Sequence, residues 1–568
     1  MKKPIDSKFK KKIISVSLLA VLLLGCAGYH AVKPGDGENV ISDHTNIEDS
    51  TDAGAAVDEA TAGEENPTPG WKLHADDKVT FDWYINFSWF ATPWGQNLVS
   101  RTITEQTGVD INFVTPKGNE AEKLNVLIAS DTLPDLITLG WWEDQIQTMI
   151  DKDMVYAINE LADEYDPYFW NVADGQIVSW NTREDGNFYF YPNSSYVPRD
   201  FEERDDIGSN QTFLVRKDIY EAIGSPDMST KEGFMNAVRK AVQKFPEVDG
   251  EPLIPIGAHE FTNSGCVSFD QYLQNFLAIP YEVNGKYHDR YTDEEYLDWL
   301  KVFRQLGSEG YLSRDIFIDQ RTQMEEKLAK GRYFCMLYQR TDMADQQKEL
   351  YRTHPERIYI AVDGPRNSHG DDPVLPGSGI NGWTVTLISK NCERPDRAME
   401  FLSYMISEEG QKMIYLGVEG VTYDTIDGVP VIKEEVQNLL DTDRVEYDKL
   451  YGADDAYWML QDGALQLNWR RKPEGPVGDL EVWSYPYTHY LGQYEVNLSN
   501  NEKAAVAANT INQLWAQTLP KLLLAESDEE FDELIAEFKR QRLKSNYGVW
   551  LQETEKQIQI NKEKLGIE

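Results

Sequence analysis

Tryptophan is the residue type whose positions point most clearly to a function in this chain of 568 residues, which contains 15 tryptophans. Five of them flank predicted strands: Trp89 and Trp94 follow the first strand, Trp141 and Trp142 follow the third, and Trp383 opens a later one. In open α/β sheets, ligands bind beyond the carboxyl ends of the strands. An indole face at such a place suits a flat apolar surface of a ligand, while nearby polar groups supply hydrogen bonds.

A sugar ring offers such a surface, because axial C–H groups cover one of its faces and hydroxyl groups line its rim. Tryptophan is also well buried on average, so each of these residues could equally belong to a hydrophobic core. Of the adjacent pair Trp141 and Trp142, we expect at least one ring outside the core. The pattern therefore predicts a site that stacks against a hydroxyl-rich ring.

Motifs for cofactor or metal chemistry come close but remain incomplete. Residues 377–382 satisfy GxGxxG, yet they lead into a predicted strand, whereas a dinucleotide site needs a helix there. The segment 259–263 begins like the zinc-protease motif and lacks its second histidine. A calcium loop aligned on Gly250 would place Phe245 and Ile256 where acidic ligands belong. We expect no cofactor and no metal, while the 96 acidic residues leave a catalytic carboxylate pair possible.

The elements that must position the tryptophans alternate between strand and helix. Residues 79–85 are apolar at every second position, as in a strand, and 109–113 and 133–139 form further short strands. Helical patterns over 97–108 and 121–128 connect them. Such a β-α-β-α-β run builds a parallel sheet with helices on both faces, so the fold class is α/β.

The first 75 residues have the pattern of an exported, anchored protein. A lysine-rich start precedes the apolar run 13–24, which is shorter than the roughly 20 residues of a membrane-spanning helix. The run ends in Leu23-Leu24-Gly25-Cys26-Ala27, which resembles the lipobox of bacterial lipoproteins and implies lipidation of Cys26. We assign 1–25 to a signal peptide and the acidic, Gly- and Thr-rich segment 26–75 to a flexible tether.

Net charge and cysteine content narrow the choice of partners. The formal charge of −41 disfavours nucleic acid, because phosphate binding needs clustered Lys and Arg. After processing, the cysteines are Cys266, Cys335 and Cys392, which are too few and too scattered for a disulfide framework. We expect three buried small hydrophobic residues.

Several segments of the chain resemble the extracellular solute-binding proteins, family 1, of bacterial ABC importers. Besides the lipobox, these segments are Leu133-Pro134-Asp135-Leu136-Ile137, Arg216-Lys217-Asp218-Ile219-Tyr220, Gly382-Trp383, Ile388-Ser389-Lys390, Pro395-Asp396-Arg397-Ala398, Ser407-Glu408-Glu409-Gly410 and 417–423. The resemblance implies a two-lobed periplasmic-binding-protein-like fold, in which each lobe is a mixed, mostly parallel sheet flanked by helices and a hinge lies between them. The implied boundaries are 76–205 and 376–430 for lobe 1, and 206–375 and 431–568 for lobe 2 with the C-terminal helices.

The resemblance also implies a ligand held between the lobes, and oligosaccharides are the solutes of the relatives nearest in size. We expect ten residues to line that cleft, although any of them could instead brace a turn or fill the core. They are Asn86, Trp89, Trp94, Trp141, Trp142, Tyr196, Tyr338, Trp383, Glu419 and Tyr423.

The resulting hypothesis is a monomeric, non-enzymatic lipoprotein on the outer face of the cell membrane. It captures an oligosaccharide and delivers it to the permease subunits of an ABC transporter. One alternative is a solute-binding lipoprotein for peptides or another non-sugar nutrient. A lipid-anchored glycosidase and, with less support, an adhesion protein are further alternatives.

Overall fold

The computed structural model describes residues 68–118, 120–498 and 501–567. The predicted signal peptide, Cys26 and most of the predicted tether lie outside the described residues. The end of the predicted tether is folded, because α1 (Gly70–Leu73) inserts Trp71 into the core. Trp71 makes edge contacts with the rings of Tyr168 and Tyr404, at centroid distances of 5.1 and 5.6 Å. Burial of this one large ring explains why the folded part begins before residue 75, the end that composition predicted for the tether.

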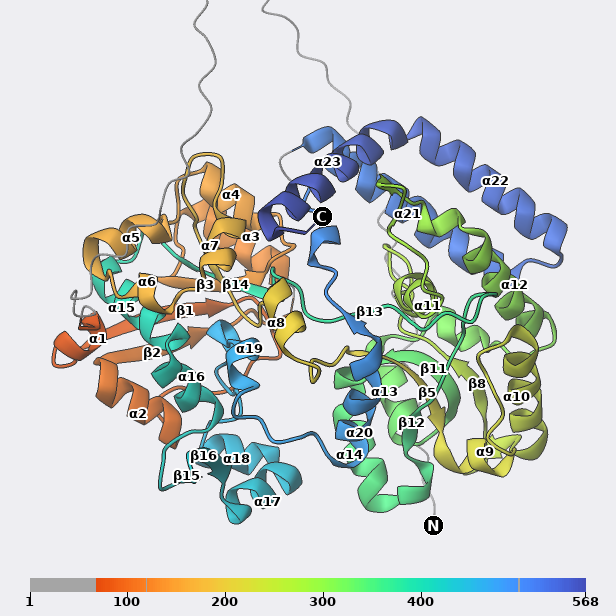
Figure 1. The fold of residues 1–568 in the computed structure, drawn as a ribbon, viewed down its shortest axis with the longest axis horizontal. Helices are drawn as coiled ribbons and strands as arrows, with labels where there is room; N and C mark the ends of the chain where they lie inside the picture. The colour runs from red at the N-terminus through yellow and green to blue at the C-terminus, as the bar shows by residue number, and fades with distance from the viewer. Residues whose placement is uncertain (1–67, 119, 499–500, 568) are drawn as a thin grey trace, which may run out of the picture. The chain divides into compact units, whose positions relative to one another are not determined.

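The first sheet has the strand order β2-β1-β3-β14-β4 (Figure 1). Its strands are β2 (Val109–Val114), β1 (Val79–Ile85), β3 (Leu136–Gly140), β14 (Thr384–Ile388) and β4 (Tyr191–Pro192). β1 runs parallel to β2 and β3, whereas β14 is antiparallel to β3 and β4. The predicted β-α-β-α-β order is confirmed, with α2 (Leu98–Thr107) and α3 (Glu120–Ser130) as the connecting helices.

Alternating side chains of the first sheet supply two cores, one on each face. Trp83 and Ile85 of β1 belong to one core, together with residues of α15 (Pro395–Ile406), while Tyr84 belongs to the other. The helix α2 begins with Asn97, whose side chain accepts a hydrogen bond from Ser100 N, and ends at Gly108 with φ of 76°. These are the two cap types expected for a short helix between strands.

The second sheet has the order β12-β5-β11-β8 and is mostly antiparallel. Its strands are β12 (Tyr359–Ala361), β5 (Gln211–Arg216), β11 (Tyr333–Gln339) and β8 (Ile254–Gly257), and β11 with β8 is the parallel pair. The expectation of a mostly parallel sheet is therefore wrong for this lobe. The chain leaves the interlobe connection through β5 and returns towards it through β8 and β11, so β5 and β11 must run in opposite directions.

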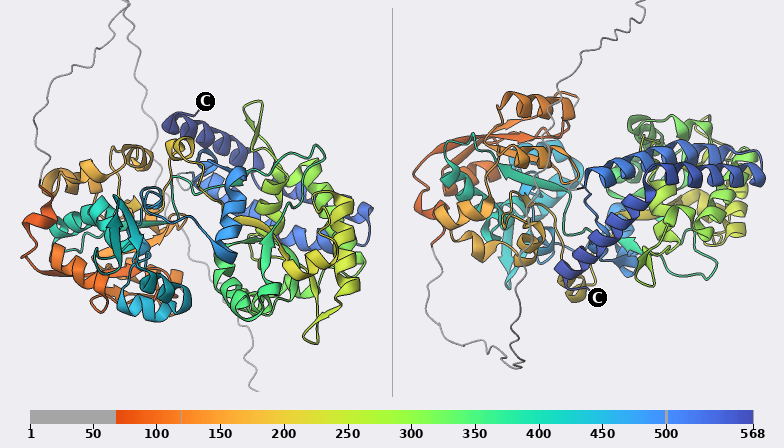
Figure 2. Two further views of the ribbon diagram at one scale, coloured as in Figure 1. Left: turned by 60° about the horizontal axis from the view of Figure 1, so that its bottom comes forward. Right: turned by 90° about the horizontal axis from the view of Figure 1, so that it is seen from above.

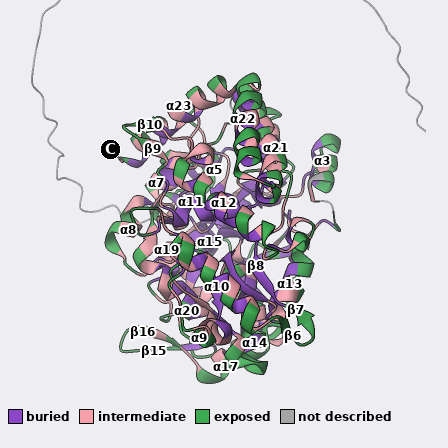
Figure 3. Ribbon diagram, turned by 90° about the vertical axis from the view of Figure 1, so that its right-hand side faces the viewer, coloured by how far each residue is buried: buried purple, intermediate pink, exposed green. Residues whose placement is uncertain are grey.

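Long helices cover the second sheet. α12 (Glu294–Ser308) packs on α21 (Glu502–Leu524), which in turn contacts α22 (Asp528–Lys544) and α23 (Tyr547–Leu565). The side chain of Ser527 caps α22 by accepting a hydrogen bond from Glu530 N, and the buried face of the helix carries Phe531, Ile535 and Phe538. Figure 3 shows the outer faces of α21 and α22 exposed while the inner strands are buried. Trp515 of α21 and Phe531 of α22 lie in this core.

The segment 434–460 packs into the first lobe, although sequence placed 431–568 with the second. Val436 of α17 (Glu434–Thr442) and Tyr447 of α18 (Arg444–Leu450) lie in the same core as Trp83. The Asn97 side chain fastens this segment by donating to Asp448 O at 3.0 Å and to Tyr457 Oη at 2.7 Å. The remaining boundaries of the lobes stay a prediction.

The three described cysteines are free and buried, which confirms their predicted role as small hydrophobic residues. Across 68–118, 120–498 and 501–567, no helix combines the length and the apolar character that crossing a membrane requires.

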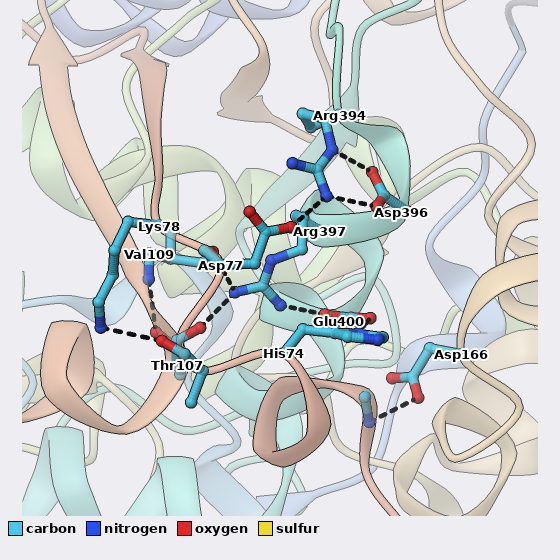
Figure 4. A network of polar contacts seen from close by, with 12 residues as sticks. His74, Asp77, Lys78, Thr107, Val109, Asp166, Arg394, Asp396, Arg397 and Glu400 are labelled. Atoms are coloured by element: carbon cyan, nitrogen blue, oxygen red, sulfur yellow. Dashed lines mark hydrogen bonds and ion pairs between the residues drawn. The ribbon is translucent and has the colours of Figure 1, made fainter.

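A buried ion pair ties the start of the folded chain to α15 (Figure 4). Arg397 and Glu400 pair with each other, and both side chains are almost wholly buried. Arg397 also donates to the carbonyl oxygens of Thr107 and Asp77, and Glu400 accepts from His74 Nδ1 at 2.5 Å. Removing one partner of such a pair leaves an uncompensated buried charge.

We therefore expect Arg397→Met to lower the free energy of unfolding by about 3–5 kcal/mol. The double variant Arg397→Met/Glu400→Leu should lose less, because it removes both charges. Urea denaturation followed by circular dichroism measures both variants. Equal losses in the single and double variants would contradict the account of the pair.

Candidate functional site

Four aromatic side chains meet at the carboxyl-terminal edge of the first sheet. We call this group, which consists of Phe87, Trp89, Trp383 and Trp458, the four-ring surface. Trp383 lies 4.5 Å from Trp458, 5.3 Å from Phe87 and 6.3 Å from Trp89 between ring centroids, and its plane is 15° from that of Trp89. Trp89 is 60% exposed, although large aromatic side chains are normally well buried. The sequence-based placement of aromatic rings at this edge is confirmed for Trp89 and Trp383.

The four-ring surface combines three segments that are distant in sequence. Phe87 and Trp89 follow β1, Trp383 precedes β14, and Trp458 begins the short helix η6 (Trp458–Leu460). Thr384 pairs with Gly140, the last residue of β3, so Trp383 lies where β3 ends. The rings therefore occupy the edge at which ligands bind in open α/β sheets.

Asn193 connects two of these segments. Its side-chain oxygen accepts from Thr384 N at 2.9 Å, and its side-chain nitrogen donates to Trp458 O at 3.1 Å. Gly382 has φ of 59°, and a Cβ at that position would collide with Asn193 O. The buried amide and the glycine thus allow Trp383 and Trp458 to approach each other.

Asn86 supports the site from below and does not reach its surface. The buried side chain accepts from Tyr84 Oη at 2.8 Å and donates to Glu143 Oε2 at 2.7 Å. Glu143 also accepts from Gly140 N at 2.8 Å, and burial raises the pKa of its carboxyl group. These bonds fix the turn after β3 that carries Trp141 and Trp142.

The pair Trp141 and Trp142 divides as expected. Trp142 is 57% exposed, whereas Trp141 packs against the second core of the first lobe. The two rings meet edge to face at 6.2 Å, and Trp141 N donates to Trp383 O at 3.4 Å. Trp142 is therefore a second exposed indole ring after β3, next in sequence to the residue whose backbone bonds Trp383.

Trp94 belongs to the core of the first lobe. Its side chain is 8% exposed, its Nε1 donates to Thr104 Oγ1 at 2.9 Å, and its ring makes edge contacts with Phe401 and Tyr457. Its predicted place in a cleft is wrong. The loop after β1 turns back onto α2 before it reaches Trp94, which brings the ring beneath the sheet edge.

Glu419 and Tyr423 lie in a separate turn after α16 (Glu408–Tyr415). They form an isolated bridge with each other, and Gly417 turns the chain with φ of 86°. Glu419 is exposed and Tyr423 is buried. Among the described residues, no hydrogen bond or ring contact joins either side chain to the four-ring surface, so the structure does not bring them to that site.

Tyr338 lies near the end of β11 in the second lobe, within a group of polar side chains. We call His259, Glu260, Arg321, Tyr338 and Asp342 the lobe 2 polar cluster. The Tyr338 ring stacks on His259 at 4.1 Å, and His259 Nε2 lies 3.9 Å from Asp342 Oδ2. Burial, followed by the charge of Arg321, lowers the pKa of His259 to about 3.

The lobe 2 polar cluster adjoins the chain that connects the two lobes. Gln339, the last residue of β11, pairs with Gln211, the first residue of β5. Arg340 N then donates to Asn210 O at 2.9 Å, within the connection that leads from lobe 1. The second sheet thus directs this cluster towards the connecting segments, and Figure 2 shows the ribbon between the two lobes from two further directions.

Tyr196 lies at the lobe 1 end of the same connection. Its backbone N donates to Gly379 O at 3.0 Å, and its ring contacts Phe201 edge to face at 6.2 Å. Burial raises the pKa of the Tyr196 hydroxyl above its ordinary value. Its predicted contact with a ligand stays a prediction.

A cavity of about 340 Å³ opens beside Tyr196, between α7 (Gly175–Asn181), α8 (Pro198–Glu203) and α19 (Gly463–Gln466). Its polar lining includes Asp174, Ser195, Arg204 and Asp462. Burial, aided by Asp200 and Asp174, raises the pKa of Asp462 to about 6. None of the four-ring residues lines this cavity, so it is a separate feature of lobe 1.

Phe87, Trp458 and the polar residues around Tyr338 were absent from the sequence-based site. Phe87 is two positions before Trp89 in the same loop, so the alternation of aromatic residues could have indicated it. No local pattern marks Trp458, because its place depends on the packing of 434–460 into lobe 1. His259 and Glu260 stand in the incomplete zinc motif, which does not indicate that they lie beside Tyr338.

Within the described parts of the chain, no three or more His, Cys, Asp or Glu side chains gather in a metal-binding arrangement. The segment that fails the calcium-loop pattern contains the hairpin β6 (Glu247–Val248) and β7 (Glu251–Pro252). Asp249 in its turn pairs with Arg357 at 2.7 Å.

A family model described as bacterial extracellular solute-binding protein matches residues 99–422, which is more than half of the chain. The chain belongs to this family. Among curated relatives of this solute-binding protein, lipoprotein LipO of Bacillus subtilis is 23% identical over 58% of this chain and 64% of its own. The polygalacturonan/rhamnogalacturonan-binding protein YtcQ of the same species is 21% identical over 64% of this chain and 72% of its own. The match thus spans less than two thirds of LipO.

Solved structures show the same two-lobed fold. Alginate-binding protein AlgQ2 without calcium has a TM-score of 0.61 at 18% identity, covering 85% of this chain and 99% of its own. The Streptococcus pneumoniae ABC-transporter substrate-binding protein FusA in complex with kestose has a TM-score of 0.61 at 16% identity, with the same coverage. At these identities the likeness establishes the fold alone.

The exposure of the tryptophans predicts how substitutions will affect stability. Trp94→Ala should lower the free energy of unfolding by about 3–5 kcal/mol, because it leaves a cavity in the core. Trp89→Ala should change it by less than about 1 kcal/mol, because most of its ring is already in solvent. Urea denaturation compares the two variants. A larger loss for Trp89→Ala than for Trp94→Ala would contradict the assignment of these rings.

Proposed function

We propose that this protein binds an oligosaccharide between its two lobes and delivers it unaltered to an ABC permease. The observation that supports the proposal most directly is the four-ring surface at the carboxyl-terminal edge of the first sheet. Of the four rings, Trp89 is 60% exposed and the others are half-buried. An apolar ring face left in solvent is costly unless a ligand covers it. Sugar rings have a complementary C–H face, and their hydroxyl groups would remain free for polar side chains.

The second lobe supplies the polar half of the proposed site. Its strands β8 and β11 end beside the interlobe connection, where the lobe 2 polar cluster offers hydrogen-bonding groups. A ligand that touches both lobes stabilises the closed arrangement by its additional contacts there. The permease would then recognise the closed form, which signals that solute is bound.

The names of the relatives favour a glycan over other solutes. YtcQ is named for binding polygalacturonan and rhamnogalacturonan, and FusA is a fructooligosaccharide-binding protein of Streptococcus pneumoniae. An HMO-binding, ABC-transporter-associated solute-binding protein from Bifidobacterium longum infantis has a TM-score of 0.62. For the present chain, the four-ring surface provides the matching stacking chemistry.

We further propose that Cys26 carries a lipid that anchors a monomeric protein to the outer face of the cell membrane. The lipobox-like sequence ending at Cys26 and the acidic segment that follows support this arrangement. A tether of this composition would let the binding domain reach a permease in the same membrane. Mass spectrometry of the membrane-extracted protein tests the modification, and an unmodified Cys26 in the mature chain would contradict it.

Glycan titration by isothermal calorimetry tests the binding function. Wild-type protein should bind at least one oligosaccharide from a panel of fructo-, galacturono-, alginate- and milk oligosaccharides. Trp383→Ala and Trp458→Ala should each weaken that binding by at least about tenfold, because stacking rings at a binding site contribute strongly to affinity. Trp170→Ala serves as the matched control, since Trp170 is also exposed but lies on α6 (Phe169–Val172), away from the sheet edge.

The outcomes separate the rival functions. Affinity that is unchanged in both variants would remove the stacking model, and binding of peptides in place of glycans would support the non-sugar alternative. Chromatography of the glycan after incubation tests for catalysis, because a glycosidase would shorten it and a transport protein would return it intact. Shortened products would contradict the non-enzymatic assignment.

A further inference from the structure

The protonation of His259 follows from its hydrogen bonds. Ser268 Oγ donates to Leu337 O at 2.7 Å, so its single proton is already used. The 2.9 Å contact between Ser268 Oγ and His259 Nδ1 therefore requires that Nδ1 carry a hydrogen and donate. The low pKa of the buried ring keeps it neutral, which leaves His259 Nε2 as a lone-pair acceptor.

Two further polar atoms of the lobe 2 polar cluster lack a partner in the described protein. They are the Tyr338 hydroxyl, in a side chain that is fully buried, and Glu260 Oε2. Buried polar atoms are nearly always hydrogen-bonded, so such atoms at the edge of a sheet point to groups of a ligand or solvent. With Nε2, the cluster offers two acceptor atoms and one hydroxyl to a ligand.

Arg321, the cation of the cluster, forms ion pairs with carboxylates of the protein. Arg321 Nη1 lies 2.9 Å from Asp342 Oδ2, and its Nε lies 2.9 Å from Glu325 Oε1. A ligand carboxylate placed here would meet Glu260, Asp342, Glu325 and the lone pair of Nε2 against the single positive charge of Arg321. Like charges in a partly desolvated site are unfavourable, whereas a hydroxyl group can donate to each of these acceptors.

We infer that the lobe 2 polar cluster selects uncharged, hydroxyl-bearing glycans and rejects glycans that carry carboxylates. The inference rests on the proposed function, and it specifies the class of ligand for the same site. Glu260 and His259 accept hydroxyl protons, and the Tyr338 hydroxyl completes the contact. The four-ring surface holds the apolar face of the sugar without regard to its charge.

Calorimetric titration with neutral and acidic glycans of matched length tests the inference. The neutral set contains fructo-, malto-, xylo- and mannooligosaccharides, and the acidic set contains galacturonate and alginate oligosaccharides. We expect the tightest ligand to be neutral and every acidic glycan to bind at least about 100-fold more weakly. An acidic glycan as the tightest ligand would overturn the inference and leave the proposed function standing. If no glycan bound, both would fail.

Two variants locate the selection on lobe 2. Tyr338→Phe should lower the affinity for the neutral ligand by about fivefold to tenfold. Thermal stability should stay the same or rise, because the Tyr338 hydroxyl has no partner in the described protein. Glu260→Gln should lower the affinity for the neutral ligand by about tenfold and reduce the difference in affinity between neutral and acidic glycans. The controls are Tyr333→Phe at the opposite end of β11 and Glu251→Gln in the hairpin β6–β7, neither of which should change affinity.

Unchanged affinity in both Tyr338→Phe and Glu260→Gln would overturn the assignment to this cluster. Loss of thermal stability in Tyr338→Phe would show a structural role for the hydroxyl and would also contradict the inference. Weakened binding at retained stability, with both controls unaffected, is the result that supports it.

Discussion

The site depends on the two hydrogen bonds of one buried amide. Asn193 has to accept from Thr384 N and donate to Trp458 O at the same time. Asparagine provides both functions from one short side chain. Through these bonds, β14 and the η6 segment, which are far apart in sequence, meet at one edge of the first sheet. The rings of Trp383 and Trp458 are consequently held 4.5 Å apart, and the loop after β1 adds Phe87 and Trp89.

The two lobes contribute different chemistry to the proposed site. Lobe 1 offers ring faces, which provide affinity with little dependence on hydroxyl pattern. Lobe 2 offers oriented polar groups. A ligand that leaves one of these groups without a hydrogen bond loses binding free energy, so the groups discriminate between ligands. In the proposed function this division gives closure a physical basis, since a ligand held by rings on lobe 1 would satisfy polar atoms on lobe 2 when the lobes approach.

Local sequence patterns predicted much of the first lobe and less of the second. The period-two pattern of β1 and the caps at Asn97 and Gly108 depend on neighbouring residues, so they can be recognised in a single sequence. The antiparallel β5–β11 pairing and the packing of 434–460 into lobe 1 depend on long-range contacts. Within the site, Trp89, Trp142 and Trp383 were placed correctly at the sheet edge, while Trp94 was misplaced because sequence does not show where a loop turns back. Trp458 could not be predicted either, because its position depends on the long-range packing of 434–460 into lobe 1.

A crystal structure of the protein with its tightest-binding oligosaccharide tests the central claim most directly. The account predicts that a sugar ring lies with its C–H face on Trp383 or Trp458 and that its hydroxyl groups reach the lobe 2 polar cluster. A glycan seated instead in the cavity between α7, α8 and α19, with no contact to the four-ring surface, would contradict it.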